Sequence, residues 1–304
     1  VDREISKDSV KTVAVIGAGY IGVEIAEAAK RRGKNVLLFD AAGRSLPSYY
    51  DTWFTDDMDK NLADHGIDLH FGELVREYKG TDRVEAVVSD AGEYPVDMVI
   101  NAIGFGPNAE LGKDHLELFA NGAYLVDRHQ QTSDPAVYAV GDCATIYSNA
   151  LQKTTYIALA SNAVRTGIVA GYNIGGTPVE SEGVQGSNGI SIFGLNLVST
   201  GLSVEAAEKN GLKVKYTDHE ALQRPAFMED NAKVKIRIVY EADSRRIVGA
   251  QLSSTEDISM GIHMFSLAIA KGVTIDELKL LDLFFLPHFN EPYNYITMAA
   301  LKAE

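Results

Sequence analysis

The stretch "KTVAVIGAGYIGVEIAEAAKRRGKNVLLFD", residues 11–40, decides the fold. Thr12–Ile16 is an apolar, β-branched run of the kind that forms a parallel strand buried on both faces. A G-x-G-x-x-G motif follows at once, and an amphipathic helical pattern then runs to Gly33, a natural helix stop. A second strand is expected at Asn35–Phe39. This order of strand, glycine turn, helix and strand predicts a dinucleotide-binding unit of the Rossmann type.

Each glycine of the motif has a separate physical role. Gly17 allows the tight turn, Gly19 lets the backbone approach a pyrophosphate, and Gly22 lets the helix pack closely on the strand. The helix that begins around Ile21 offers free N–H groups and the positive end of its dipole to the phosphates. These four residues are therefore predicted to bind the cofactor.

The acidic residue at the end of the second strand selects the cofactor. Asp40 stands at the expected distance from the glycines. A carboxylate accepts hydrogen bonds from both ribose hydroxyls of NAD but repels the 2′-phosphate of NADP, and a charged hydrogen bond is worth about 1.5–3 kcal/mol. Arg44 lies close enough to suggest NADP, but an exposed loop arginine is its more ordinary interpretation and Asp40 outweighs it. The sequence predicts a preference for NAD(H).

The remainder of the chain supplies further elements. A helix is expected at Thr55–His65, and a buried strand at Met98–Ile103, stopped by Gly104, completes a parallel sheet. Towards the C-terminus, "KVKIRIVYEA" and "IVGAQLSS" predict an antiparallel hairpin. A helix that ends at Gly272 and a capping box at Thr274-x-x-Glu277 follow.

Composition excludes several classes of partner. The 304 residues carry a formal net charge of −14 without a basic stripe, which argues against nucleic acid and anionic membranes as partners. The apolar runs are too short to cross a bilayer, and "VDREISKDS" has no targeting pattern, so a cytoplasmic protein is expected. Cys143 is the only cysteine, which excludes a disulfide within the chain; it is interpreted as a small buried filler without catalytic role.

Five segments together resemble a known family. They are "VAVIGAGYIGVEIAEA", "INAIGFGPNAEL", "TSDPAVYAVGDCA", "YIALASNAVRTGIVAG" and "DLFFLPHFNEPYNY". In this order they resemble the FAD- and NAD-dependent pyridine-nucleotide-disulfide oxidoreductases over essentially the whole chain. Within that family they are most similar to the branch that holds water-forming NADH oxidase, NADH peroxidase and coenzyme A-disulfide reductase.

The resemblance implies an α/β architecture in three parts. Residues 1–108 would be a Rossmann-like NAD-binding domain with a parallel sheet and a short N-terminal linker, and residues 109–185 the second half of an FAD-binding domain. Residues 186–304 would be an α+β domain with antiparallel strands that forms a homodimer. Family members begin with another G-x-G-x-x-G and a redox cysteine, which this chain lacks; we therefore expect a truncated chain.

The resemblance also assigns roles on the NAD side. Tyr20 resembles a tyrosine that gates the flavin ring and swings aside for NADH; its alternative is an aromatic residue packed on the end of the sheet. Glu24, one helical turn later, could hydrogen-bond the nicotinamide carboxamide or serve only as a first-turn acid favoured by the helix dipole. Gly104 is included among the predicted cofactor-binding residues.

On the flavin side, the resemblance implies three groups of residues. Gly141 makes a turn and Asp142 would accept a ribityl hydroxyl of FAD, while also capping the following helix. Leu159 and Ala160 would line the pyrimidine of the flavin. His288 would lie near the redox cysteine of the partner subunit and is the candidate catalytic residue together with Tyr20. The alternative for His288 is a histidine packed among the neighbouring Phe residues, without a catalytic role.

The predicted parent is an FAD-dependent NADH oxidase that reduces oxygen to water, with peroxide or a disulfide such as that of coenzyme A as alternative acceptors. This chain alone is expected to bind NADH but to turn over weakly or not at all. A non-catalytic NADH-binding and dimerisation fragment is therefore the rival interpretation. A flavin-free NAD-dependent dehydrogenase is a third, but no acid or base residue stands near Gly17–Glu24 to serve it.

Overall fold

The structure is a computed structural model that describes residues 1–304. The chain forms two compact units, each made of segments that are far apart in the sequence. The first consists of Val1–Gly104, Gly189–Leu197 and Leu252–Ile258, and the second of Phe105–Asn188, Val198–Gln251 and Ser259–Glu304. None of the helices is both long and apolar enough to cross a membrane.

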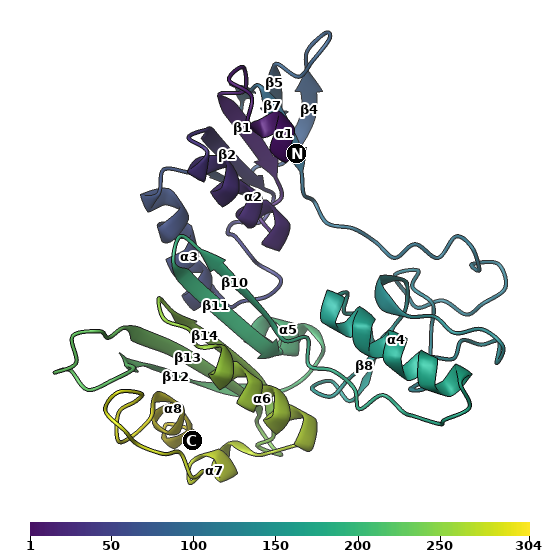
Figure 1. The fold of residues 1–304 in the computed structure, drawn as a ribbon, viewed down its shortest axis with the longest axis vertical. Coiled ribbons are helices and arrows are strands. Elements are labelled where there is room, and N and C mark those ends of the chain that lie inside the picture. The colour runs from purple at the N-terminus through teal and green to yellow at the C-terminus, as the bar shows by residue number, and fades with distance from the viewer. The chain divides into compact units, whose positions relative to one another are not determined.

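The first unit is built on a parallel sheet of four strands in the order β3-β2-β1-β7, of which β1, β2 and β7 are labelled in Figure 1. The strands are β1 (Thr12–Ile16), β2 (Asn35–Asp40), β3 (Asp68–Phe71) and β7 (Met98–Asn101), and every neighbouring pair is parallel. Helix α2 (Tyr20–Arg31) connects β1 to β2, and α3 (Thr52–Asp64) precedes β3; a short helix, α1 (Asp2–Ile5), precedes the sheet. This arrangement confirms the Rossmann-type unit that residues 11–40 predict.

Local chemistry explains these elements. Val13, Ala14 and Val15 of β1 are fully buried, as expected for a strand covered on both faces. Helix α2 buries one stripe that includes Val23, Ala26 and Ala29 and then ends where Gly33 adopts φ +73°. Only glycine takes this left-handed conformation without steric cost.

One predicted element is shorter than expected. The strand predicted at Met98–Ile103 ends at Asn101, and the side chain of Ile103 is 73% exposed. The last backbone bond to β1 is donated by Ala102 to the carbonyl of Ile16, after which β1 itself turns away at Gly17. No strand remains beside residues 102 and 103 to extend the ladder.

A small antiparallel sheet in the order β4-β5-β6 interrupts the parallel pattern between β3 and β7. Its strands are β4 (Val75–Lys79), β5 (Ala86–Ser89) and β6 (Glu93–Pro95). Val87 and Val96 pack with Phe39 in a buried cluster at the parallel sheet. The antiparallel strands thus cover part of the core of the first unit.

The second unit contains the segment in which a flavin-binding half-domain is expected. It has a short 3₁₀ turn, η1 (Gly141–Cys143), the two-stranded pair β8 (Ile146–Ser148) and β9 (Lys153–Thr155), and the helix α4 (Ala160–Ile174). A small core surrounds Tyr124, Val126 and Ala144. Helix α4 begins within the stretch "YIALASNAVRTGIVAG", one of the five that carry the family resemblance.

The C-terminal part has a five-stranded sheet in the order β10-β11-β14-β13-β12. These strands are β10 (Asn188–Ile192), β11 (Leu195–Gly201), β12 (Val214–Leu222), β13 (Lys233–Glu241) and β14 (Ile247–Ser254), and the helices are α5 (Val204–Lys209), α6 (Ser259–Lys271), α7 (Ile275–Leu278) and α8 (Tyr295–Leu301). The predicted hairpin of β13 and β14 is confirmed, as is the capping box of Thr274 and Glu277 at α7. The expectation of an α+β portion with antiparallel strands is therefore confirmed.

The hairpin of β10 and β11 packs into the first unit at its tip. Ile190, Ile192 and Leu197 are buried in the same cluster as the core residues of β1, α2 and α3. The chain reverses at Phe193 and Gly194, both with positive φ, which matches the primed turn that suits the twist of a two-residue hairpin. The three domain boundaries drawn from the sequence stay predictions.

Candidate functional site

The glycine turn between β1 and α2 leaves no room for side chains at two of its three glycines. A Cβ atom at Gly17, which has φ +101°, would lie 2.4 Å from the carbonyl oxygen of Ala102, and one at Gly22 would lie 1.7 Å from the carbonyl oxygen of Gly17. A Cβ atom at Gly19 would meet nothing within 4 Å. The backbone at Gly19 therefore faces open space, as the approach of a pyrophosphate requires.

Helix α2 begins at this turn without a side-chain cap. Gly19 is the N-cap residue, and its carbonyl accepts the first helical bond from Val23. The N–H groups of the first helical turn have no partner within the helix, and the helix dipole places partial positive charge there. Ile21 in this turn is half exposed. The turn thus has the chemistry of an anion site.

Asp40 is held by the backbone around the turn. Its Oδ2 accepts a hydrogen bond from the N–H of Ala18 at 2.6 Å, and its Oδ1 accepts one from the N–H of Ala42 at 2.7 Å. Each carboxylate oxygen accepts more than one hydrogen bond, so these contacts orient Asp40 and leave acceptor capacity for ribose hydroxyls. Arg44 is half-buried rather than exposed, because it lies close enough to Asp59 of α3 to interact electrostatically with it.

Tyr20 is packed rather than extended into solvent. Its hydroxyl lies 2.8 Å from the hydroxyl of Tyr50, and its ring meets the ring of Tyr49 edge-on at 4.5 Å between centroids. Burial, with the neighbouring Tyr50, raises the pKa of Tyr20 far above its ordinary value. The sequence analysis missed Tyr49 and Tyr50; the adjacent aromatic pair in "SYYD" was the available signal. Gating by Tyr20 stays a prediction.

Two further predicted residues on the NAD side are open to solvent. Glu24 is exposed one turn along α2, and Gly104, with φ +93°, has no atom within 4 Å of an added Cβ. Both can therefore be reached by a ligand. Their roles in cofactor binding stay predictions.

In the second unit, the predicted flavin residues lie together. The N–H of Gly141 donates to Thr166 Oγ1 of α4 at 3.1 Å, and a Cβ atom at Gly141 would lie 3.4 Å from Cβ of Ala163. Leu159 is the N-cap residue of α4 and Ala160 its first residue, with no side-chain cap. The turn at residues 141–143 is thus placed against the first part of α4.

Asp142 does not cap a helix as predicted. It lies inside the 3₁₀ turn, whose N-cap residue is Val140, and no side chain caps this turn. The reason is that Gly141, with φ +72°, starts the turn one residue earlier than a cap at Asp142 requires. The exposed carboxylate is consequently available to a ligand hydroxyl. Cys143 is half-buried rather than buried as predicted, because it lies in the short 3₁₀ turn, where its thiol donates to the carbonyl of Val140.

His288 is exposed in the stretch between α7 and α8. Its neighbours in the sequence, Phe285 and Phe289, are also exposed, so the histidine is not buried among aromatic rings within this chain. Tyr293 is exposed, whereas burial raises the pKa of Tyr295, the first residue of α8, to about 12. The catalytic role of His288 stays a prediction.

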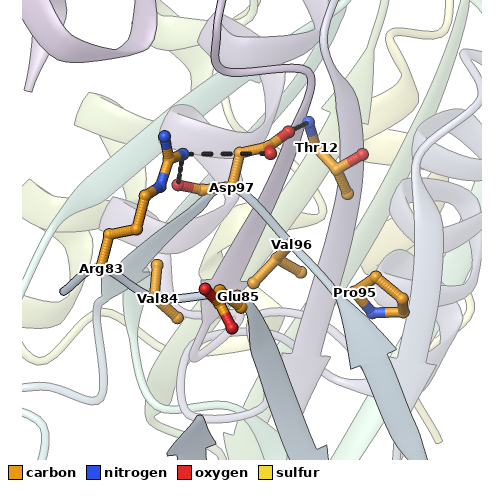
Figure 2. A pocket seen from close by; sticks show the side chains of 7 residues that line it. All are labelled: Thr12, Arg83, Val84, Glu85, Pro95, Val96 and Asp97. Carbon is orange, nitrogen blue, oxygen red and sulfur yellow. Dashed lines mark hydrogen bonds and ion pairs between the residues drawn. The ribbon is translucent and has the colours of Figure 1, made fainter. Parts of the chain in front are cut away.

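A hollow of about 230 Å³ near the start of β1 contains charged groups but serves the fold. Figure 2 shows Arg83 and the backbone of Thr12 directed at Asp97. Asp97 accepts hydrogen bonds from the N–H groups of Thr12 (2.9 Å) and Lys11 (2.8 Å), which lower its pKa. Since these bonds fasten the first residues of β1, we assign the hollow no ligand.

The sheet order, the sterically required glycine turn and the oriented Asp40 define an α/β protein with a dinucleotide-binding unit. Comparison with known proteins agrees. Residues 2–167 match the family model described as pyridine nucleotide-disulphide oxidoreductase, and residues 189–295 match the dimerisation domain of the same family. The chain belongs to the pyridine nucleotide-disulphide oxidoreductase family.

Several relatives are NADH oxidases. The chain is 65% identical to the NADH oxidase of Lactococcus lactis subsp. cremoris, with 100% of this chain and 69% of that protein covered. It is 37% identical to the water-forming NADH oxidase from Lactobacillus brevis solved with NADH, with a TM-score of 0.94 over 98% of this chain and 66% of that one. An engineered NADPH oxidase variant of the latter, solved with NADPH, has 36% identity, a TM-score of 0.94 and the same coverage of 98% and 66%. The chain thus spans about two thirds of the length of these relatives.

Proposed function

We propose that the chain is the NAD(H)-binding, flavin-facing and dimer-forming portion of an FAD-dependent NADH oxidase that reduces oxygen to water. The observation that carries this proposal is the turn from Gly17 to Gly22, in which the uncapped start of α2 and the oriented carboxylate of Asp40 are held together. The names of the relatives support NADH as the electron donor and water as the product.

The NADPH-bound variant supports the role given to Asp40. That variant carries five substitutions: at a Gly, at an Asp 18 residues later, at the next two residues, and at a Pro five residues further on. Gly22, Asp40, Ala41, Ala42 and Pro47 have the same spacing in this chain. In that variant the aspartate becomes alanine and arginines are introduced, changes that favour a 2′-phosphate. We infer that Asp40 selects NADH.

The chain offers groups that fit part of an FAD. Asp142 supplies an exposed carboxylate for a ribityl hydroxyl, and α4 begins at Ala160 with uncapped backbone N–H groups and small side chains. When bound, FAD would take up the electrons of NADH and deliver them to the acceptor. The residues of this chain would orient the two cofactors, while Tyr20 controls access to the nicotinamide.

A second candidate function, from another class, is a non-catalytic NADH-binding and dimerisation fragment. The exposed side of α4 favours it, because Val164, Ile168 and Tyr172, spaced by four residues, are all more than half exposed. A helix face of this kind is normally covered by protein. On this basis the chain by itself binds NADH without rapid turnover.

Calorimetric titration of the purified chain with NADH and NADPH tests the proposal. NADH should bind more tightly than NADPH, and Asp40→Ala should weaken NADH binding by about tenfold or more, since a charged hydrogen bond contributes about 1.5–3 kcal/mol. Unchanged affinities for both nucleotides in Asp40→Ala would remove its assigned role. An absorption spectrum decides between the two functions, because flavin bound near stoichiometry would contradict the fragment.

A further inference from the structure

A chain of hydrogen bonds connects the start of α2 to the β10–β11 hairpin. The hydroxyl of Tyr50 donates to the carbonyl oxygen of Leu197 in β11 at 3.1 Å. A phenol has one proton, so in the 2.8 Å contact between the two hydroxyls Tyr20 is the donor and Tyr50 the acceptor. The order of donation is therefore Tyr20 to Tyr50 to Leu197.

The last acceptor in this series of hydrogen bonds, the carbonyl of Leu197, belongs to a hairpin that is held in place. The N–H of Phe193 at the hairpin tip donates to Glu27 of α2 at 2.7 Å, and Asn61 of α3 donates to the carbonyl of Ile192 at 2.8 Å. The ring of His65 stacks on the ring of Phe193 with centroids 4.0 Å apart. The hairpin is thus fastened to both helices of the first unit.

Tyr50 itself is fully buried, whereas Tyr20 is only half-buried. The side chain of Tyr20 can therefore turn towards solvent, whereas the side chain of Tyr50 is enclosed by the protein. Tyr20 is also the first residue of α2, directly after Gly19, at the place where the dinucleotide is proposed to bind.

We propose that Tyr50 is a positioning residue that holds Tyr20 in its packed position against the anchored carbonyl of Leu197, so that the Tyr50 hydroxyl sets how readily NADH displaces Tyr20. This inference rests on the proposed function, in which Tyr20 controls access to the nicotinamide. It adds Tyr50 as the group that restrains Tyr20, and the carbonyl of Leu197 in the β10–β11 hairpin as the anchor of Tyr50.

The two hydroxyls differ in what their removal leaves behind. In Tyr50→Phe the half-buried hydroxyl of Tyr20 loses the acceptor that Tyr50 provides, which destabilises the packed position and favours the displaced one. The carbonyl of Leu197 loses its donor whether Tyr20 is packed or displaced. This loss therefore does not change the equilibrium between the two positions. In Tyr20→Phe the ring keeps its edge-on contact with Tyr49, and the hydroxyl of Tyr50 still donates to the carbonyl of Leu197.

The test is NADH binding to the 304-residue chain and its variants by calorimetry. We expect Tyr50→Phe to bind NADH about fivefold more tightly, which corresponds to the net loss of about one hydrogen bond from the packed state. Tyr20→Phe and the double variant should bind NADH with equal affinity, because without the Tyr20 hydroxyl the Tyr50 hydroxyl has no group to hold. Tyr49→Phe is the matched control, because it removes a neighbouring hydroxyl while keeping the edge-on ring contact, and its NADH affinity should stay within about twofold of that of the unaltered chain.

A second measurement uses the unaltered chain and does not depend on whether Tyr50→Phe folds. With 3-fluorotyrosine incorporated, the resonances of Tyr20 and Tyr50, assigned by the single variants or by selective labelling, should both shift when NADH saturates the chain.

The outcomes separate this inference from the proposed function. The role of Tyr50 alone is overturned by either of two results. One is equal NADH affinity of Tyr50→Phe and the unaltered chain, and the other is a Tyr50 resonance that does not shift when NADH is added. Failure of the folded, unaltered chain to bind NADH overturns the proposed function and this inference together.

Discussion

Asp40 serves the fold and the proposed ligand with the same carboxylate. The bonds from Ala18 and Ala42 fix its orientation beside the glycine turn, so little rotamer entropy remains to be lost when a ribose binds. Gly17 and Gly19 have different roles in the turn. Gly17 is required by the fold, because a side chain there would collide with Ala102, whereas Gly19 leaves space for a ligand.

This division predicts opposite results for two matched substitutions. Gly17→Ala should lower the melting temperature clearly, because it combines φ +101° with a Cβ position 2.4 Å from a carbonyl oxygen. Gly19→Ala should leave the melting temperature unchanged, since φ is −72° and the space is empty, but should weaken NADH binding by about tenfold. Thermal unfolding and calorimetry of both variants check this. A Gly19→Ala chain with full NADH affinity would place the pyrophosphate elsewhere.

At the scale of elements, the first unit depends on a hairpin that comes from a distant part of the chain. Glu27 is central to this attachment, because its Oε1 accepts from the N–H of Phe193 and also pairs with Arg31 at 2.8 Å. The side chain of Glu27 is 15% exposed and that of Arg31 is 61% exposed, so the bond from Phe193 is partly shielded from solvent whereas the ion pair is open to it. Arg31 also lies over the ring of Phe193, 5.3 Å from its centroid.

We therefore expect Glu27→Ala to reduce the free energy of unfolding by about 1.5–3 kcal/mol, the range for hydrogen bonds to charged groups. Asp64→Ala on α3 is the control. It removes an exposed ion pair with Lys60, which contributes less than about 0.5 kcal/mol. Urea denaturation measures both, and equal effects of the two substitutions would show that Glu27 does not hold the hairpin.

A hydrogen-bonded carboxylate, Glu73, lies at the junction between β3 and the small antiparallel sheet. Burial by itself raises the pKa of Glu73, but hydrogen bonds from His70, Ser89 and Tyr94 outweigh burial and lower this pKa. Because the folded-state pKa is depressed, the stabilisation is present above the unfolded value of about 4.3 and is lost as the pH falls through the folded value.

Stability should accordingly fall on acidification below about pH 5, and Glu73→Gln should flatten this dependence while lowering stability at neutral pH. Urea denaturation over a series of pH values provides the measurement. Glu93→Gln, which changes an exposed partner of Lys79, is the control and should leave the slope unaltered. An unchanged slope in Glu73→Gln would mean that other carboxylates cause the acid sensitivity.

At the scale of the whole molecule, the proposed homodimer predicts where association occurs. Truncation after Gly186 should give monomers, but it also removes Ile190, Ile192 and Leu197 from the core of the first unit and should lower its stability. Phe284→Asp separates the two effects, because this side chain is 67% exposed and belongs to no core cluster. Sedimentation of this variant should show monomers with an unchanged melting temperature, and a persistent dimer would place the interface elsewhere.

The local pattern was sufficient to predict the βαβ unit, the capping box at Thr274 and the β13–β14 hairpin. In each case a turn, a cap or a strand period acts within about ten residues, so neighbouring side chains determine the conformation. The same reasoning failed at Asp142, where the left-handed Gly141 moves the turn by one residue. It also failed at Arg44, whose partner comes from another element.

The sequence by itself determined the parallel sheet, the glycine turn and the acidic residue that points to NAD(H), because these follow from short-range steric and charge requirements. Only the tertiary structure decided that the β10–β11 hairpin completes the first unit and that Tyr20 is bonded through Tyr50 to Leu197. These contacts join residues separated by 30 and 147 positions. No local pattern encodes such pairs, since they form only when packing of the hydrophobic core brings the elements together.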